Sequence, residues 1–213
     1  MSELVLSVLD QSVALAGRGE DASIRETVAL AAHCEALGYA RFWVSEHHAL
    51  TTIIGSAPEI LMAAIAATTR RIRIGSAGVM LPHYSALKVA EQFRVLEALA
   101  PGRIDLGVGR APGGDMRTAL ALNPNAQRAA DEFPQQVLDL QAWVGGAAHG
   151  GITAHPRGEH APQLWVLVAA RVLLGFGTCA GYPAAMYLIR SEARRTGHDS
   201  PAGYQAGGNV LAL

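Results

Sequence analysis

Runs of apolar, often β-branched residues recur along the first half of the chain, separated by segments in which apolar positions have helical spacing. The runs begin near residues 4, 40, 71 and 103, so they repeat at intervals of roughly 31 to 36 residues. Near-continuous apolar strands that alternate with amphipathic helices are typical of a parallel sheet covered by helices on both faces. The pattern therefore predicts an α/β fold, with strands over 4–9, 40–45, 72–80 and 103–108.

Start and stop signals bound the helical segments between these strands. Ser23 precedes Glu26 by three residues, which predicts a capping box at the start of the first helix, and Gly38 predicts its end. Pro134 is expected to break or restart the last segment. The predicted helices span 24–37, 59–68, 86–99 and 127–144.

The alternating pattern weakens beyond Gly145. Residues 164–169 predict a fifth strand, and 171–180 are apolar with a helical tendency. A modest helix is predicted over 184–195, before a segment rich in Gly, Ser, Pro and Asn that is expected to be irregular.

The chain is short for a closed barrel. An eight-stranded βα barrel needs about 250 residues, and this chain has 213. We therefore expect an incomplete, TIM-barrel-like (β/α) domain of five to six units over 1–183, followed by a C-terminal helix and tail over 184–213.

Small residues interrupt two of the predicted strands. Residues 75–78 read Gly-Ser-Ala-Gly, and the strand that starts at 103 ends in Gly107, Gly109 and Arg110. Small residues in a strand predict the close approach of another backbone or of a ligand. Because α/β proteins bind ligands at the carboxyl ends of their strands, we expect the functional site within 71–114.

Composition narrows the class of protein. Half of the residues are hydrophobic, and 17 basic against 18 acidic residues give a net charge of −1. Nothing resembles the basic surface of a nucleic-acid-binding protein. The N-terminus has no basic segment typical of a signal peptide, and the apolar run 164–174 is too short for a membrane span and contains Arg171. We expect a soluble, cytoplasmic protein in which Cys34 and Cys179 form no disulfide or metal pattern.

Four stretches carry a resemblance to a known family. They read LSVLDQS, RFWVSEHHA, the long block from SAPEIL to GRAPGG, and FPQQVLDL, together covering about residues 3–143. This pattern resembles the bacterial-luciferase-like, flavin-dependent monooxygenases of MsnO8 type. The resemblance implies a βα barrel that binds FMN at the carboxyl ends of its strands. It also implies reduced FMN supplied by a separate flavin reductase, O2 as co-substrate and a small organic substrate.

The resemblance also implies roles for individual residues. His47 matches a position beside the flavin and is the expected catalytic residue. The segment 76–78 matches the place where family backbone packs against the flavin ring, often through a non-proline cis peptide. The expected cofactor-binding residues are Glu46, Ser76, Ala77, Gly78, Gly107, Gly109 and Arg110.

The second half departs from the family pattern. Where the family has Gly-Ser-Ser at the FMN phosphate, this chain has Val168-Ala169-Ala170. Loss of the hydroxyls removes hydrogen bonds to a charged phosphate worth about 1.5–3 kcal/mol each. Three functions therefore stay open: an FMN-dependent monooxygenase, a flavin-binding protein without turnover, and an inactive truncated relative that is stabilised as a homodimer.

Other candidate chemistry is weaker. Arg110 is placed equally well for a phosphate or flavin carbonyl and for a surface pair with Asp115, and Arg94 is expected to pair with Glu91 or another helix. The spacing of one group of potential ligands matches no zinc motif, so no metal site is predicted. That group is Glu46, His47, His48 and His83.

Overall fold

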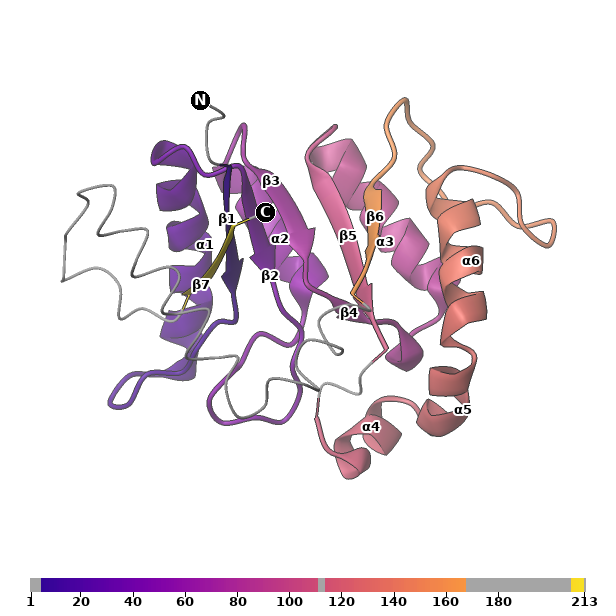
Figure 1. Cartoon of the computed structure of the whole chain (residues 1–213), viewed down its shortest axis with the longest axis horizontal. Coiled ribbons are helices and arrows are strands. Elements are labelled where there is room, and N and C mark those ends of the chain that lie inside the picture. The colour runs from indigo at the N-terminus through magenta and orange to yellow at the C-terminus, as the bar shows by residue number, and fades with distance from the viewer. Residues whose placement is uncertain (1–4, 111–113, 168–207, 213) are drawn as a thin grey trace.

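The computed structural model describes residues 5–110, 114–167 and 208–212. Its centre is a sheet in which five strands run parallel and lie side by side in chain order (Figure 1). This order is that of a (β/α) barrel, as the repeat predicts. The five strands are β1 (Leu6–Asp10), β2 (Arg41–Val44), β3 (Arg73–Ser76), β5 (Ile104–Gly109) and β6 (Gln163–Val166).

Helices connect consecutive strands and pack on one side of the sheet. In Figure 1, α2 and α3 lie behind the strands, with α1 and α6 at the two ends of the row. The connecting helices are α1 (Glu20–Ala36), α2 (Pro58–Thr68), α3 (Ala86–Leu99) and α6 (Phe133–Val144). Two short helices, α4 (Met116–Leu122) and α5 (Ala126–Asp131), precede α6, and a 3₁₀ turn, η1 (Leu81–His83), precedes α3.

The two faces of the sheet differ in chemistry. Side chains that face the helices, such as Phe42, Ile74 and Leu106, are fully buried in one hydrophobic core. Alternate positions point the other way; among them Trp43 donates from its ring nitrogen to Asp105 at 3.0 Å. The prediction of helices on both faces is therefore wrong for the described residues. In a curved sheet the inner face is filled by side chains of the strands themselves.

Helix boundaries follow the predicted signals in part. Helix α1 begins at Glu20, so Ser23 lies inside it and the predicted capping box is wrong. Two acids in the first turn stabilise this end through the helix dipole instead. Gly38, with a φ of +84°, ends the helix as predicted. The break at Pro134 is also confirmed, since α5 ends at Asp131 and Pro134 lies in the first turn of α6.

The predicted strand over 72–80 is divided in two. After β3 the chain turns through Ala77 and Gly78, whose peptide bond is cis, and continues as β4 (Val79–Met80). Strand β4 pairs with the last residues of β5, Val108 and Gly109. The carboxyl ends of β3 and β5 are thus joined where the small residues lie.

Residues 208–212, predicted to be part of an irregular tail, form strand β7 (Gly208–Ala212) instead. This strand runs antiparallel to β1, whose outer edge offers unpaired backbone donors and acceptors. The predicted helical segments 171–180 and 184–195 lie outside the described residues, as does the Val168-Ala169-Ala170 segment. Within the described helices, none is both long and apolar enough to cross a bilayer.

Candidate functional site at the carboxyl ends of the strands

Three segments meet at the carboxyl ends of the parallel strands. They are residues 45–48 after β2, 80–84 after β4, and 107–109 at the end of β5. The Met80 backbone N–H donates to the Glu46 carboxylate at 2.9 Å, which ties the first segment to the second. Strand β4 ties the second to the third through its ladder with β5. These contacts bring residues far apart in sequence together at the carboxyl ends of the strands.

Glu46 is the fixed centre of this site. Its side chain is fully buried, and its Oε1 lies 2.7 Å from the His48 ring nitrogen Nε2 and accepts from the Tyr84 hydroxyl at 2.7 Å. Because a buried carboxylate is tolerated only when its oxygens are bonded, these donors explain how Glu46 is accommodated. Burial and the Glu46 charge raise the pKa of Tyr84, so its hydroxyl stays protonated and remains a donor.

His47 has a different environment from its neighbour. Its backbone N–H donates to the Gly55 carbonyl at 2.9 Å, and its ring Nδ1 lies 3.1 Å from the Ser45 hydroxyl. Burial, and then the nearby His48, lower the pKa of His47, so its ring is neutral near pH 7. A half-buried, neutral imidazole at the rim of a site can accept or deliver a proton.

Glu59 is a site residue that sequence reasoning missed. It lies in the first turn of α2 and is half-buried. Burial raises its pKa, and the charge of Glu46 adds to that effect. The sequence around it signals only a helix start, with Pro58 at the first position. Nothing local indicates that α2 directs its amino end toward Glu46.

Ser76 and Gly107 are hydrogen-bonded to each other within the sheet. The Ser76 hydroxyl donates to the Gly107 carbonyl at 2.8 Å and accepts from the Gly107 N–H at 3.0 Å. A Cβ on Gly107 would lie 2.1 Å from the Ser76 carbonyl oxygen. The small residues here permit the close approach of another backbone, one of the two causes that the sequence suggested.

Ala77 and Gly78 follow Ser76, and Gly109 is the last residue of β5. All three therefore lie beyond the Ser76–Gly107 contact in the direction in which the strands run. A Cβ on Gly78 would meet Leu167 Cδ1 at 2.8 Å and the Gly107 carbonyl oxygen at 3.0 Å. At Gly109 the nearest atom to an added Cβ is Met80 Sδ at 3.7 Å, so space remains there. We refer to Ala77, Gly78 and Gly109 together as the backbone wall.

Arg110 is paired, but not with the predicted partner. Its Nε donates to the Ala130 carbonyl at 2.7 Å and its Nη2 to Asp131 at 3.2 Å. Asp115 instead accepts from the Thr118 N–H at 2.7 Å as the cap of α4. The predicted pairing with Asp115 is therefore wrong, because the aspartate is needed at the start of a helix.

Two further groups of side chains can be located among the described residues. Arg94 does not pair with Glu91; it is buried and donates to the backbone carbonyls of Val144 and Pro156. Among residues 5–110, 114–167 and 208–212, no three His, Cys, Asp or Glu side chains gather in a way that could hold a metal ion.

Comparison with known proteins decides the family. The family described as luciferase-like monooxygenase matches residues 4–160, which is more than half of the chain. The chain belongs to the luciferase-like monooxygenase family. The segments after β2 and β4 that form the site lie wholly within the matched part.

Several relatives and solved structures are similar to this family member. An uncharacterized Bacillus subtilis protein, YwcH, is 50% identical over 190 residues, covering 86% of this chain and 57% of its own length. The N-acetyl-S-alkylcysteine monooxygenase of the same organism is 52% identical over 141 residues, covering 65% of this chain and 42% of its own. The crystal structure of apo-MsnO8 superimposes with a TM-score of 0.71 at 41% identity, covering 77% of this chain and 49% of that one.

Each alignment covers a larger share of this chain than of the relative. This chain spans about half the length of the curated relatives it matches. Most of this chain is aligned, and it aligns to one part of each longer relative.

Proposed function

We propose that the protein is an FMN-dependent monooxygenase, which uses reduced FMN and O2 to oxidise a small organic substrate. The observation that carries the proposal is that the half-buried His47 follows Glu46, whose carboxylate is bonded to Met80 and Tyr84 shortly after Ala77 and Gly78 in the chain. Family membership supports the same chemistry. A separate flavin reductase as the source of reduced FMN, and a cytoplasmic location, belong to the proposal as well.

The residues present fit a flavin ring in part. A flat tricyclic ring needs small residues behind it and a few polar groups at its edge. Ala77, Gly78 and Gly109 supply the first, and His47 supplies a polar edge. Arg110 is exposed and its contacts with Ala130 and Asp131 lie at the surface, so it can exchange them for an anionic group of the cofactor.

The remaining predicted cofactor residues would act indirectly. Glu46 directs its oxygens to Tyr84, Met80 and His48, and the Ser76 hydroxyl is bonded to Gly107. We propose that Glu46 and Ser76 fix the position of the wall rather than contact the ring.

Each group of this chain has a definite task in the proposed reaction. Bound reduced FMN supplies the two electrons with which O2 is activated. The neutral ring of His47 would accept or deliver a proton at its free edge, while Ser45 holds Nδ1. Glu46 and Tyr84 would keep the β4 segment in place and limit access of water from that side.

A flavin-binding protein without turnover is the second candidate. It is favoured by Val168-Ala169-Ala170, which replace the residues expected at the FMN phosphate. An inactive truncated relative, stabilised as a homodimer that covers the exposed strand edges, is the third candidate.

Anaerobic titration of the purified chain with dithionite-reduced FMN tests the proposal. We expect saturable binding in wild type, at least tenfold weaker binding or slower substrate-dependent O2 consumption in His47→Gln, and no change in the exposed control His33→Gln. O2 consumption with a flavin reductase present separates the enzyme from the non-catalytic binding protein. A folded protein that binds neither redox form of FMN would contradict both.

A further inference from the structure

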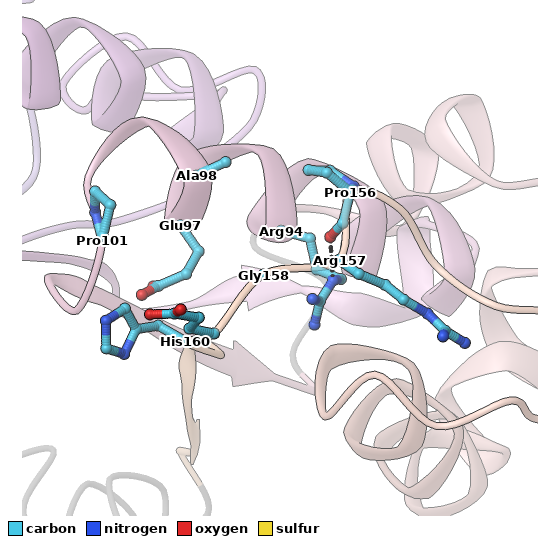
Figure 2. A pocket seen from close by; sticks show the side chains of 9 residues that line it. Arg94, Glu97, Ala98, Pro101, Pro156, Arg157, Gly158 and His160 are labelled. Carbon is cyan, nitrogen blue, oxygen red and sulfur yellow. Dashed lines mark hydrogen bonds between the residues drawn. The ribbon is translucent and has the colours of Figure 1, made fainter.

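A cavity lies at the opposite end of the strands from the candidate site. It has a volume of about 240 Å³ and is formed between the carboxyl half of α3, the turn that follows it, and the loop before β6 (Figure 2). It borders the turn that starts β5, whereas Gly109 lies at the other end of that strand. Six strand residues separate the two ends by about 20 Å. The cavity is therefore independent of the proposed flavin site.

One buried acceptor in this cavity lacks a donor. Glu97 is only 4% exposed, and its Oε1 accepts from the Gly102 backbone N–H. Its other oxygen, Oε2, has no hydrogen-bond partner among the described residues, although it is shielded from solvent. A buried, unpaired carboxylate oxygen is costly. Because Glu97 lines the cavity, the unpaired oxygen of its carboxylate indicates a ligand that carries a donor.

The surroundings define the chemistry of that donor. Figure 2 shows the Glu97 carboxylate directed to the end of the cavity where His160 lies, while the Arg157 side chain points away from it. Glu159 adds a second carboxylate to the lining. The Arg94 guanidinium donates to the Val144 and Pro156 carbonyls, and no ion pair joins it to Glu97 among the described residues.

Two other classes of ligand fit less well. No three metal-binding side chains gather within the described residues, which disfavours a divalent cation. An anion would face Glu97 and Glu159. An ammonium group supplies three N–H donors together with a positive charge, and Ala98, Pro101 and Pro156 offer apolar surface for a short alkyl chain.

We propose that this cavity binds the ammonium group of a small alkylamine, with Glu97 Oε2 as its buried acceptor and Glu159 at its rim. The cavity is smaller than the sites that take drug-sized ligands, so the ligand is a short primary amine. Since a ligand of so few atoms gains little binding energy, the expected Kd is in the millimolar range.

The test uses n-butylammonium chloride as the probe and the ¹⁵N-labelled whole chain. We expect saturable amide shifts at Gly158, Glu159 and His160, and no saturable shifts with tetramethylammonium, which has no N–H donor. Glu97→Gln retains an oxygen for the Gly102 N–H and should weaken binding at least tenfold. Glu91→Gln, on the same helix but outside the cavity lining, should leave the Kd unchanged.

Each other outcome contradicts the proposal. Wild-type affinity in Glu97→Gln, equal binding of tetramethylammonium, or no saturable shift in wild type would each overturn it. Should Glu97→Gln fail to fold, Glu159→Gln replaces it, and an unchanged Kd in that exposed variant would then count against the site. The readout involves no flavin, so it fails or succeeds independently of the proposed function.

Discussion

Two fully buried carboxylates, Glu46 and Asp105, are accommodated by this fold in different ways. Asp105, on the inner face of the sheet, is bonded to Arg73 and Trp43 and lies 3.4 Å from Arg41 Nε. Glu46, at the carboxyl ends of the strands, has a histidine, a tyrosine and a backbone N–H as partners.

The different partners of Asp105 and Glu46 indicate different roles for the two carboxylates. Arginine remains charged at all working pH values, so Asp105 is held by permanent counter-charges. The partners of Glu46 are an imidazole, a phenolic hydroxyl and a backbone N–H. A carboxylate held by arginines fixes strands together, whereas Glu46 lies next in the chain to His47, whose pKa is lowered by burial.

Removing the charge of Asp105 should produce the largest effect. Asp105→Asn leaves Arg41 and Arg73 partly buried without their counter-charge, so we expect the free energy of unfolding to fall by about 3–5 kcal/mol. Urea denaturation measures it. As a control, Asp139→Asn removes the charge of a partly exposed carboxylate whose partners are Gln135 and His149, and it should cost about 1 kcal/mol or less. Equal losses in the two variants would contradict a structural role for the Asp105 cluster.

The matching change at Glu46 should cost less. Glu46→Gln keeps one oxygen but turns an NH₂ group toward donors, which leaves one buried bond unmade, worth about 1–3 kcal/mol. The expected result is a smaller loss of unfolding free energy than in Asp105→Asn, together with weaker binding of reduced FMN. If Asp105→Asn changed FMN binding by the folded protein and Glu46→Gln did not, the roles assigned to the two carboxylates would be reversed.

A third variant removes an uncharged hydroxyl, that of Ser76, and tests its contribution to the free energy of unfolding. Ser76→Ala leaves the buried N–H and carbonyl of Gly107 without partners, so we expect a loss of about 2 kcal/mol in urea denaturation. Ser85→Ala is the matched control. Its side chain is exposed and makes no capping bond to α3, so its effect should stay within about 0.5 kcal/mol. Indistinguishable variants would mean that the Ser76 hydroxyl does not hold β3 to β5.

The smallest effect concerns the pH dependence of stability. The pKa of His47 is lowered in the folded state, so below its ordinary value of about 6.5 the unfolded chain binds more protons. Stability should therefore rise with pH through the window from the folded pKa up to about 6.5. In urea denaturation across this window, the free energy of unfolding of His47→Gln should rise less with pH than that of wild type. The difference over the whole window should be about 1 kcal/mol or less. A steeper slope in the variant would contradict a lowered pKa.

Sequence patterns predicted the parts of the fold that depend on local periodicity. The β-helix-β repeat placed β1, β2, β3, β5 and β6 in order, because each strand carries its own apolar run. The division of the third strand could not be predicted, since β4 is defined by pairing with Val108 and Gly109 rather than by its own residues. The capping error at Ser23 has a similar cause, because acids one turn earlier begin the helix.

The location of the site at the carboxyl ends of the strands stays a prediction. Small residues marked the segment after β3, and the paired histidines marked the end of β2. The bonds from Glu46 to Met80 and Tyr84, and from Ser76 to Gly107, join residues about 30 to 40 positions apart. No local pattern encodes such bonds. Glu59 was missed for the same reason, since its raised pKa depends on how α2 packs against the site.

The central claim is that a flavin lies beside His47 while His48 stays bonded to Glu46. Long-range ¹H–¹⁵N spectra of the imidazoles, recorded under anaerobic conditions with and without reduced FMN, test it most directly. We predict that the ring resonances of His47 shift on FMN addition and that those of His48 keep the signature of the Glu46 bond. Unchanged His47 resonances at saturating FMN, with shifts confined to His149, His155 or His160, would contradict it.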